Sequence, residues 1–153
     1  MPAPVGAARV VVDPNVLVSA AITRGTARSV VELAAGGSYV MVVCPHLVDE
    51  LTVVLGRDRF LRWRTREQLD RFVADIVALA DHTDDPDIVA AVTRDPNDDY
   101  LVALAVNSAA VICTGDRDLH DPELQVEVLT PADLVARFRP SRLPARDAPP
   151  RER

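Results

Sequence analysis

The sequence predicts an α/β fold with a parallel sheet covered by helices on both faces. Short apolar runs rich in β-branched residues alternate with longer segments of helical periodicity, which is the pattern of strand–helix–strand units. The first apolar run ends at Asp13 and a later one ends near Asp116. Ligands of open α/β sheets bind beyond the carboxyl ends of the strands, so these two ends mark the expected site.

The bulk composition indicates one folded domain. The chain has 153 residues, 48% of them hydrophobic, which is enough for a single core. No apolar run approaches the roughly 20 residues that span a bilayer, and Met1–Ala8 lacks the features of a secretion signal, so we expect a cytoplasmic protein without membrane contact. Cys44 and Cys113 lie in or beside expected strands and are interpreted as buried small hydrophobic residues in a reducing compartment.

The charge is acidic, with a formal net value of −6. Taken alone, this value argues against non-specific binding of nucleic acid. If several acids converge on divalent cations, however, the bound cations make that site much less negative than the net charge of the chain suggests. All 17 basic residues are arginine, so mechanisms that require a lysine are excluded.

Local signals place the elements of the first half. Pro14 is expected to turn the chain off the sheet directly after the first strand. Gly36 and Gly37 end the first expected helix, and Pro45 suits the first position of the next. The expected elements are a strand at Arg9–Val12, a helix from Thr26 to about Ala35, a strand at Tyr39–Val43 and a helix from Pro45 to about Leu55.

The second half continues the alternation. Thr65 and Gln68 have the spacing of a capping box, which opens a helix reaching Leu79. Pro and Arg dominate after Phe138, so residues 1–138 are expected to form the domain and 139–153 a disordered tail. The remaining expected elements are an extended piece at Ile88–Val92, a helix from about Pro96 to Ser108, a strand at Val111–Thr114, a turn or short helix at Asp116–His120, a strand at Val126–Leu129 and a helix from Thr130-Pro131 to about Phe138.

Two acids can be assigned from position on their elements. Asp13 follows a strand expected to be buried, where a carboxylate without a partner is costly in free energy, and this position favours a functional role. The alternative is that Asp13 forms a turn or a helix cap. Asn15 could orient Asp13 or cap the next segment. At about 100° per residue, Asp49 points away from the apolar stripe of its helix, whereas Glu50 lies on the border and can reach a cleft.

The other candidate acids follow two later turns. Asp95 suits a helix N-cap and Asp98 the third helical position, which leaves Asp99 as the functional candidate with Asp98 in reserve. Asp116 is favoured over Asp118 as the functional acid because it is nearer the strand end, although a turn with a capped helix explains one of the two. Thr114 could hold a water or a phosphate oxygen. His46, His82 and His120 share no ligand spacing and are interpreted as structural or exposed.

Carboxylates from four separate segments suit hard divalent cations. Magnesium and manganese prefer carboxylate and water oxygens, and a pair of such ions can clamp a phosphodiester. There is neither a zinc-type Cys/His cluster nor a P-loop motif. Metal at the neighbouring ends of two strands is therefore the working hypothesis, with Asp13, Glu50, Asp99 and Asp116 as the acids.

The motifs resemble those of the PIN-domain nucleases, and most closely the toxins of prokaryotic toxin–antitoxin pairs. The matching segments are Val-Val-Asp13-Pro-Asn15-Val-Leu-Val, Asp49-Glu50-Leu51, Arg94-Asp95-Pro96-Asn97-Asp98-Asp99-Tyr100-Leu101 and Thr114-Gly115-Asp116-Arg117-Asp118-Leu119, within about Arg9 to Phe138. The resemblance implies a five-stranded parallel sheet in a three-layer α/β/α fold and cleavage of single-stranded RNA with Mg²⁺ or Mn²⁺. It also implies a small antitoxin partner and a homodimer. By this resemblance the four family acids map onto Asp13, Glu50, Asp99 and Asp116, with Asp118 as an additional acid and Thr114 as a polar neighbour.

Two other functions stay open. A phosphatase of the haloacid dehalogenase type also has an aspartate after its first strand, but it usually has a second aspartate two residues on, where this chain has Asn15, and a lysine, which is absent. A receiver domain would need the same lysine. A non-catalytic binding module could use the acidic cleft or the arginines between Arg57 and Arg66; these are expected to form a solvated face around Phe60 and Trp63, although RNA could also bind them.

Overall fold

A five-stranded parallel sheet forms the centre of the computed structural model, which describes residues 6–87 and 98–140. The strand order is β3-β2-β1-β4-β5, so the first strand lies in the middle. Val10, Val11 and Val12 are buried, which confirms a first strand covered on both faces. The strands are β1 (Arg9–Val12), β2 (Val40–Val43), β3 (Asp81–His82), β4 (Val111–Cys113) and β5 (Val128–Leu129).

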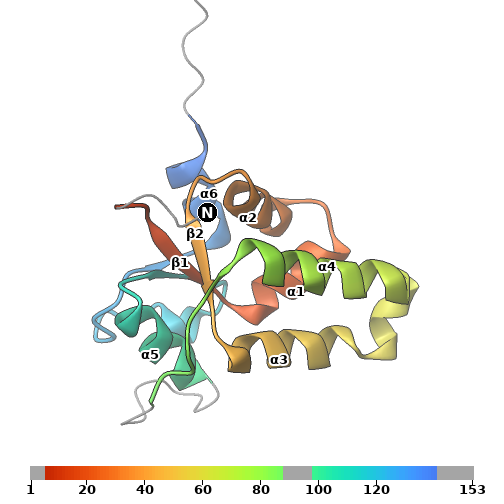
Figure 1. Cartoon of the computed structure of the whole chain (residues 1–153). Helices are drawn as coiled ribbons and strands as arrows, with labels where there is room; N and C mark the ends of the chain where they lie inside the picture. The colour runs from red at the N-terminus through yellow and green to blue at the C-terminus, as the bar shows by residue number, and fades with distance from the viewer. Residues whose placement is uncertain (1–5, 88–97, 141–153) are drawn as a thin grey trace, which may run out of the picture.

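Helices cover both faces of this sheet, so the fold is the expected three-layer α/β/α arrangement (Figure 1). The helices are α1 (Pro14–Ile22), α2 (Thr26–Ala35), α3 (Pro45–Leu55), α4 (Arg66–Leu79), α5 (Asp99–Asn107) and α6 (Pro131–Phe138), with short 3₁₀ helices η1 (Asp58–Arg62) and η3 (Arg117–Leu119). Right-handed connections place α1 to α4 on one face and α5, which leads into β4, on the other, while α6, after β5, returns to the face of α2. The contacts agree, because α1 packs on α2 and α3, α3 packs on α4 and α6 packs on α2, whereas α5 packs on β1 and β4.

The strand order reverses between β1 and β4. From β1 the chain builds outward through β2 to β3, and it then returns to the other side of β1 to form β4 and β5. Val10, Val11 and Val12 pair with Val111, Ile112 and Cys113, so the two strand ends lie side by side, as the sequence predicted. Ligand sites of open α/β sheets form at such a reversal.

The helix α1 was not expected from the sequence. Pro14 takes the chain off the sheet, as expected, and it does so as the first residue of a nine-residue helix, where a missing N–H has no cost. Val16, Leu17, Ala20 and Ala21 are all buried. The helix is apolar on most sides, so it lacks the one-sided periodicity that reveals a surface helix.

Several other boundaries differ from the expectations. The fifth strand is β3, whose two residues are exposed and polar and therefore give no apolar signal. The expected strand at Val126–Leu129 is shortened to Val128–Leu129. The expected strand at Ile88–Val92, the helix start at Pro96 and most of the tail lie outside the described residues. Within the described residues α5 begins at Asp99 and Asp98 is its N-cap. The helix start that would make Asp98 the third helical residue, at Asp95 and Pro96, lies outside the described residues.

Other local predictions are confirmed. Thr65 and Gln68 form the reciprocal capping box at the start of α4, and α2 ends at Gly36, followed by Gly37 with a φ of 83° that favours glycine. Cys44 and Cys113 are buried free thiols, and burial raises the pKa of Cys44 to about 11 and that of Cys113 to about 12. In the described segments, no helix has the length and apolar character needed to cross a membrane.

Candidate functional site

Asp13 lies at the carboxyl end of β1, and only 4% of it is exposed. Its Oδ1 accepts a hydrogen bond from the backbone N–H of Asn15 at 3.0 Å, and its Oδ2 accepts one from the hydroxyl of Thr114 at 2.7 Å. Its own backbone N–H donates to the carbonyl of Cys113 at 2.9 Å. Asp13 is therefore the N-cap of α1 and at the same time connects the ends of β1 and β4.

Thr114 holds the turn after β4 in place. Its buried hydroxyl donates to Asp13 and accepts the backbone N–H of Asp116 at 3.0 Å, so its one donor is used within the protein. Asp116 is half-buried, and its Oδ1 accepts the backbone N–H of Asp118 at 2.9 Å, which makes Asp116 the cap of η3. Asp118 is exposed. The expected capped turn is present, and it directs the half-buried Asp116 toward the strand ends.

Glu50 approaches the site from α3. It is half-buried whereas Asp49 is exposed, as the helical geometry predicted. The hydroxyl of the buried Tyr100 donates a hydrogen bond to Glu50 Oε2 at 2.5 Å. Burial, followed by the hydrogen bond to Glu50 and then the charge of Glu50, raises the pKa of Tyr100 above its ordinary value, so this phenol stays protonated and remains a donor.

Tyr100 is the site residue that the sequence did not reveal. It stands among apolar residues of α5 and resembles a core aromatic residue. Its ring packs against that of His46 with centroids 4.1 Å apart, which supports the structural interpretation of His46. His82 and His120 contact backbone carbonyls, of Val77 and Thr114 respectively, and are also structural.

Asp99 precedes Tyr100 and is 3% exposed. It is the first residue of α5, where the helix dipole favours a negative charge. This is a structural position that the sequence analysis did not assign to Asp99. Asp99 is nevertheless buried beside the tyrosine that contacts Glu50, and Asp98 is half-buried at the cap.

The pKa of Asp13 is affected by two of the other acids. Burial raises its pKa; the hydrogen bonds from Asn15 and Thr114 lower it, and the charges of Glu50 and Asp116 raise it again. None of these three acids forms an ion pair with an arginine in the described part of the chain. Hard oxygen donors with excess negative charge fit a divalent cation in type. Across residues 6–87 and 98–140, however, no three Asp, Glu, His or Cys side chains are grouped closely enough to form a preorganised metal site.

An open pocket of about 450 Å³ lies beside this cluster. Asp13 and Asp116 both line it, together with residues of α1 and α2, Gly115 and Pro131. The pocket therefore gives a ligand direct access to two of the predicted acids.

Residues 9–118, well over half of the chain, match the PIN domain family. The chain belongs to the PIN-domain family. PIN domains are generally nucleases. The fold of this PIN domain is similar to that of a chain in the crystal structure of VapBC2 from Rickettsia felis bound to a DNA fragment from their promoter. The TM-score is 0.58 and the identity 12%, over 80% of this chain and 98% of that chain, which is a likeness of fold alone. No match was found among curated proteins.

Proposed function

We propose that this PIN domain is a metal-dependent endoribonuclease that hydrolyses RNA phosphodiesters. The observation that carries the proposal is the buried carboxylate of Asp13 at the β1–β4 reversal, which is repelled by Glu50 and Asp116 and has no ion pair with an arginine in the described segments. Keeping clustered carboxylates charged costs free energy unless a cation offsets their repulsion. Cation-dependent hydrolysis of a phosphodiester is a reaction that requires such a group of carboxylates.

Mg²⁺ or Mn²⁺ would be held by Asp13, Glu50, Asp99 and Asp116, with Asp118 as an additional ligand. Such an ion supplies Lewis-acid stabilisation of the phosphate and activation of water. The remaining residues orient these acids. Thr114 and the backbone N–H of Asn15 fix both oxygens of Asp13, and Tyr100 holds one oxygen of Glu50 while leaving the other open. Asp98, the N-cap of α5, directly precedes Asp99 and would be the supporting acid there.

The proposed biological role is that of a toxin in a type II toxin–antitoxin pair. The motifs resemble those toxins, and the solved structure of similar fold is that of VapBC2 bound to a promoter DNA fragment. We infer a small antitoxin protein as partner, a homodimer and a cytoplasmic location. Family membership supports a nuclease, and the choice of RNA over DNA rests on the toxin resemblance.

Cleavage of unstructured and structured RNA tests this proposal directly. The parent chain, Asp13→Asn and a control, Asp70→Asn on the exposed surface of α4, are compared with magnesium, manganese or chelator. The parent and Asp70→Asn should cleave only with metal, and Asp13→Asn should lose at least about a hundredfold in rate, as loss of one electrostatic group at a reacting centre typically gives.

Two other results would replace the proposal. Hydrolysis of small phosphate esters through a phospho-aspartate would indicate a phosphatase. Stable binding of a protein partner, with no hydrolysis in any metal, would indicate a binding module.

A further inference from the structure

The pocket that Asp13 and Asp116 line also contains apolar and neutral polar side chains. Its volume of about 450 Å³ lies within the range of small-molecule sites. Val16, Ala27 and Pro131 supply apolar surface, and Asn15, Ser19 and Thr26 supply neutral polar groups. Of the described residues that line it, only Asp13 and Asp116 are charged.

The polar groups of this pocket are available to a ligand. Asn15, Ser19 and Thr26 are exposed, and their side chains make no hydrogen bond within the described residues. The hydroxyls and the amide can each donate and accept, so they can recognise the edge of a planar heterocycle. The small apolar side chains can contact its faces.

The charges of the pocket exclude other ligand classes. Among the described residues no arginine lines it, so a phosphate would meet two carboxylates with no compensating cation from that part of the protein. A phosphate is therefore expected at the acids with the metal, whereas an uncharged part of the substrate enters the pocket. In RNA the uncharged groups next to a phosphate are the ribose and the base that the ribose carries.

We propose that this pocket, here called the base pocket, binds the base and ribose of the nucleotide next to the bond that is cut, and that Ser19 and Thr26 select among bases. The inference rests on the proposed function, since it assigns a substrate subsite to the same nuclease. It predicts a sequence preference at one position beside the cleaved bond.

Gly115 offers a steric probe of this assignment. A Cβ built on Gly115 meets no atom within 4 Å, and its φ lies outside the left-handed region that disfavours other residues. Gly115→Val should therefore fold normally while adding bulk at the wall of the base pocket. Ser19→Ala removes a single hydroxyl from the same pocket, and Ser38→Ala, at an exposed serine outside the pocket, is its matched control.

The test measures kcat/KM on short oligoribonucleotides that differ only in the base on either side of the cleaved bond. The parent and Ser38→Ala should share one preference. Ser19→Ala should reduce that preference several-fold, and Gly115→Val should lower kcat/KM by about tenfold or more through KM, which is the size of effect expected from a blocked or unpaired substrate contact. Unchanged melting temperatures verify that the variants fold.

Two outcomes would overturn the base pocket, and each separates it from the proposed function. If the parent cleaves RNA and both pocket variants keep its preference and KM, the nuclease stands and the base pocket is wrong. If the parent cleaves no RNA, the proposed function is wrong, and NMR titration with the four nucleoside 5′-monophosphates tests the pocket by itself. Shifts of the Ser19, Thr26 and Gly115 amides that are weakened in Gly115→Val would support it, and their absence would overturn it.

Discussion

At the scale of single residues, Asp13 combines two roles that the sequence presented as alternatives. It caps α1 through Asn15, and it also lies buried at the strand reversal, bonded to Thr114 and repelled by Glu50 and Asp116. A capping role therefore does not argue against a functional one. The position makes its charge costly in the absence of a cation.

Asp13→Asn should preserve or raise the thermal stability of the metal-free protein. Because the pKa of Asp13 is raised in the folded state, principally by burial, protonation favours folding, and this stabilisation disappears as the pH rises through the folded-state pKa. The stability gap between variant and parent should therefore be widest near neutral pH and should narrow on acidification through that pKa. Thermal melts at a series of pH values in chelator measure it; a variant that is unfolded at every pH would show that Asp13 is a scaffold residue alone.

Tyr100→Phe should separate the effect of Tyr100 on the position of Glu50 from its contribution to core packing. The ring and its contact with His46 remain, and only the hydrogen bond to Glu50 is lost, at a cost of about 1 kcal/mol in stability. We expect kcat to fall with little change in KM, because Glu50 is less firmly held.

Tyr39→Phe is the control for that variant. It also removes a buried tyrosine hydroxyl, which donates to the carbonyl of Val30, and Tyr39 does not line the pocket at the acids. Its stability should fall by a similar amount while kcat is retained. Equal kcat values in the two variants would mean that Tyr100 is a core residue without influence on Glu50.

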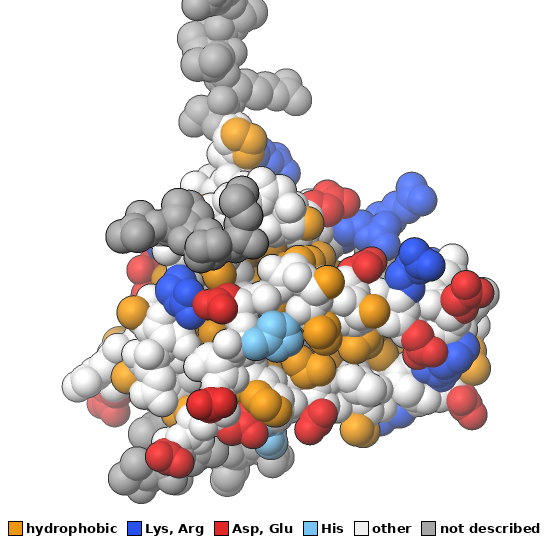
Figure 2. All heavy atoms as spheres, in the orientation of Figure 1, with side chains coloured by type: hydrophobic (Ala, Val, Ile, Leu, Met, Phe, Trp, Pro, Cys, Tyr) orange, Lys and Arg blue, Asp and Glu red, His pale blue; other side chains and the backbone are white. Residues whose placement is uncertain are grey.

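At the scale of elements, α3, η1 and α4 form an arm that projects from the sheet (Figure 1). Its arginines are largely used within the arm. Arg59 lies over the ring of Phe60 at 4.7 Å, Arg62 lies over that of Trp63 at 4.9 Å, and Arg64 donates to the carbonyl of Trp63. Figure 2 shows arginine and acidic side chains interspersed at the α4 end of the molecule, which agrees with a solvated face.

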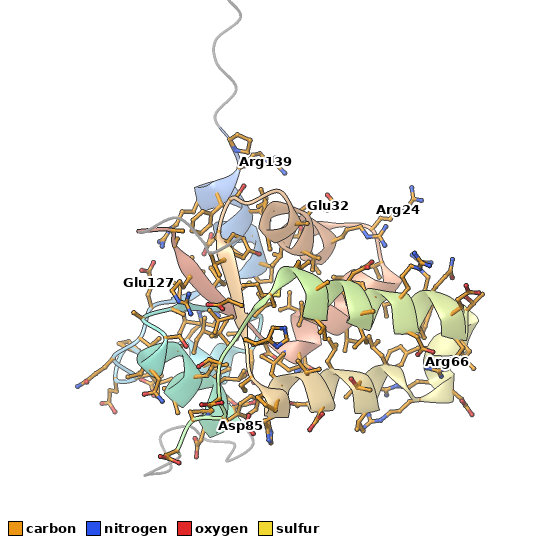
Figure 3. The ribbon with its side chains drawn as sticks, viewed as in Figure 1. Arg24, Glu32, Arg66, Asp85, Glu127 and Arg139 are labelled. Atoms are coloured by element: carbon orange, nitrogen blue, oxygen red, sulfur yellow. The ribbon has the colours of Figure 1, made fainter. Side chains whose placement is uncertain are left out.

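Arg66 connects the two helices of the arm. Its guanidinium donates to the carbonyls of Leu55 at 2.8 Å and Gly56 at 3.1 Å, at the C-terminal end of α3 where a cation is favourable. Figure 3 shows Arg66 at the junction of the helices and Arg24 pointing away from the protein. Arg66→Gln should cost about 1 kcal/mol, reduced from the value for buried bonds because the side chain is partly exposed. Denaturant unfolding measures it, and a loss no larger than that of Arg24→Gln would contradict the assignment.

At the scale of the whole molecule, the site joins both sides of the strand reversal. Glu50 comes from the helices that follow β2, and Asp116 from the turn after β4. A contact between distant segments also holds the start of α3. The side chain of Asp85 accepts the backbone N–H of His46 at 2.8 Å, and it takes the place of a side-chain cap, which the N-cap residue Cys44 does not provide. A ligand that bridges the acids would therefore stabilise the entire fold.

Magnesium should raise the melting temperature of the parent more than that of Asp13→Asn. A ligand that binds only the folded state stabilises by about 2.7 kcal/mol at a hundred times its dissociation constant, and loss of a ligand removes part of this gain. Thermal melts over a magnesium series measure the difference. Equal shifts in both proteins would place the cation elsewhere.

The sequence by itself determined the strands β1, β2 and β4, the capping box at Thr65 and the acids at the strand ends. These signals depend on residues only a few positions apart, because burial period and capping act locally. Local signals failed for α1, whose helix is apolar on most sides, and for β3, whose two residues are exposed.

Only the tertiary structure decided which residues contact the candidate acids. The bond from Thr114 to Asp13 spans 101 positions and that from Tyr100 to Glu50 spans 50. Such contacts depend on strand order and on which face each helix covers, which periodicity along the chain does not specify. The types of the candidate site residues could therefore be predicted from sequence. Their partners, including Tyr100, and the residues of the proposed base pocket followed only from the arrangement of the sheet and its helices.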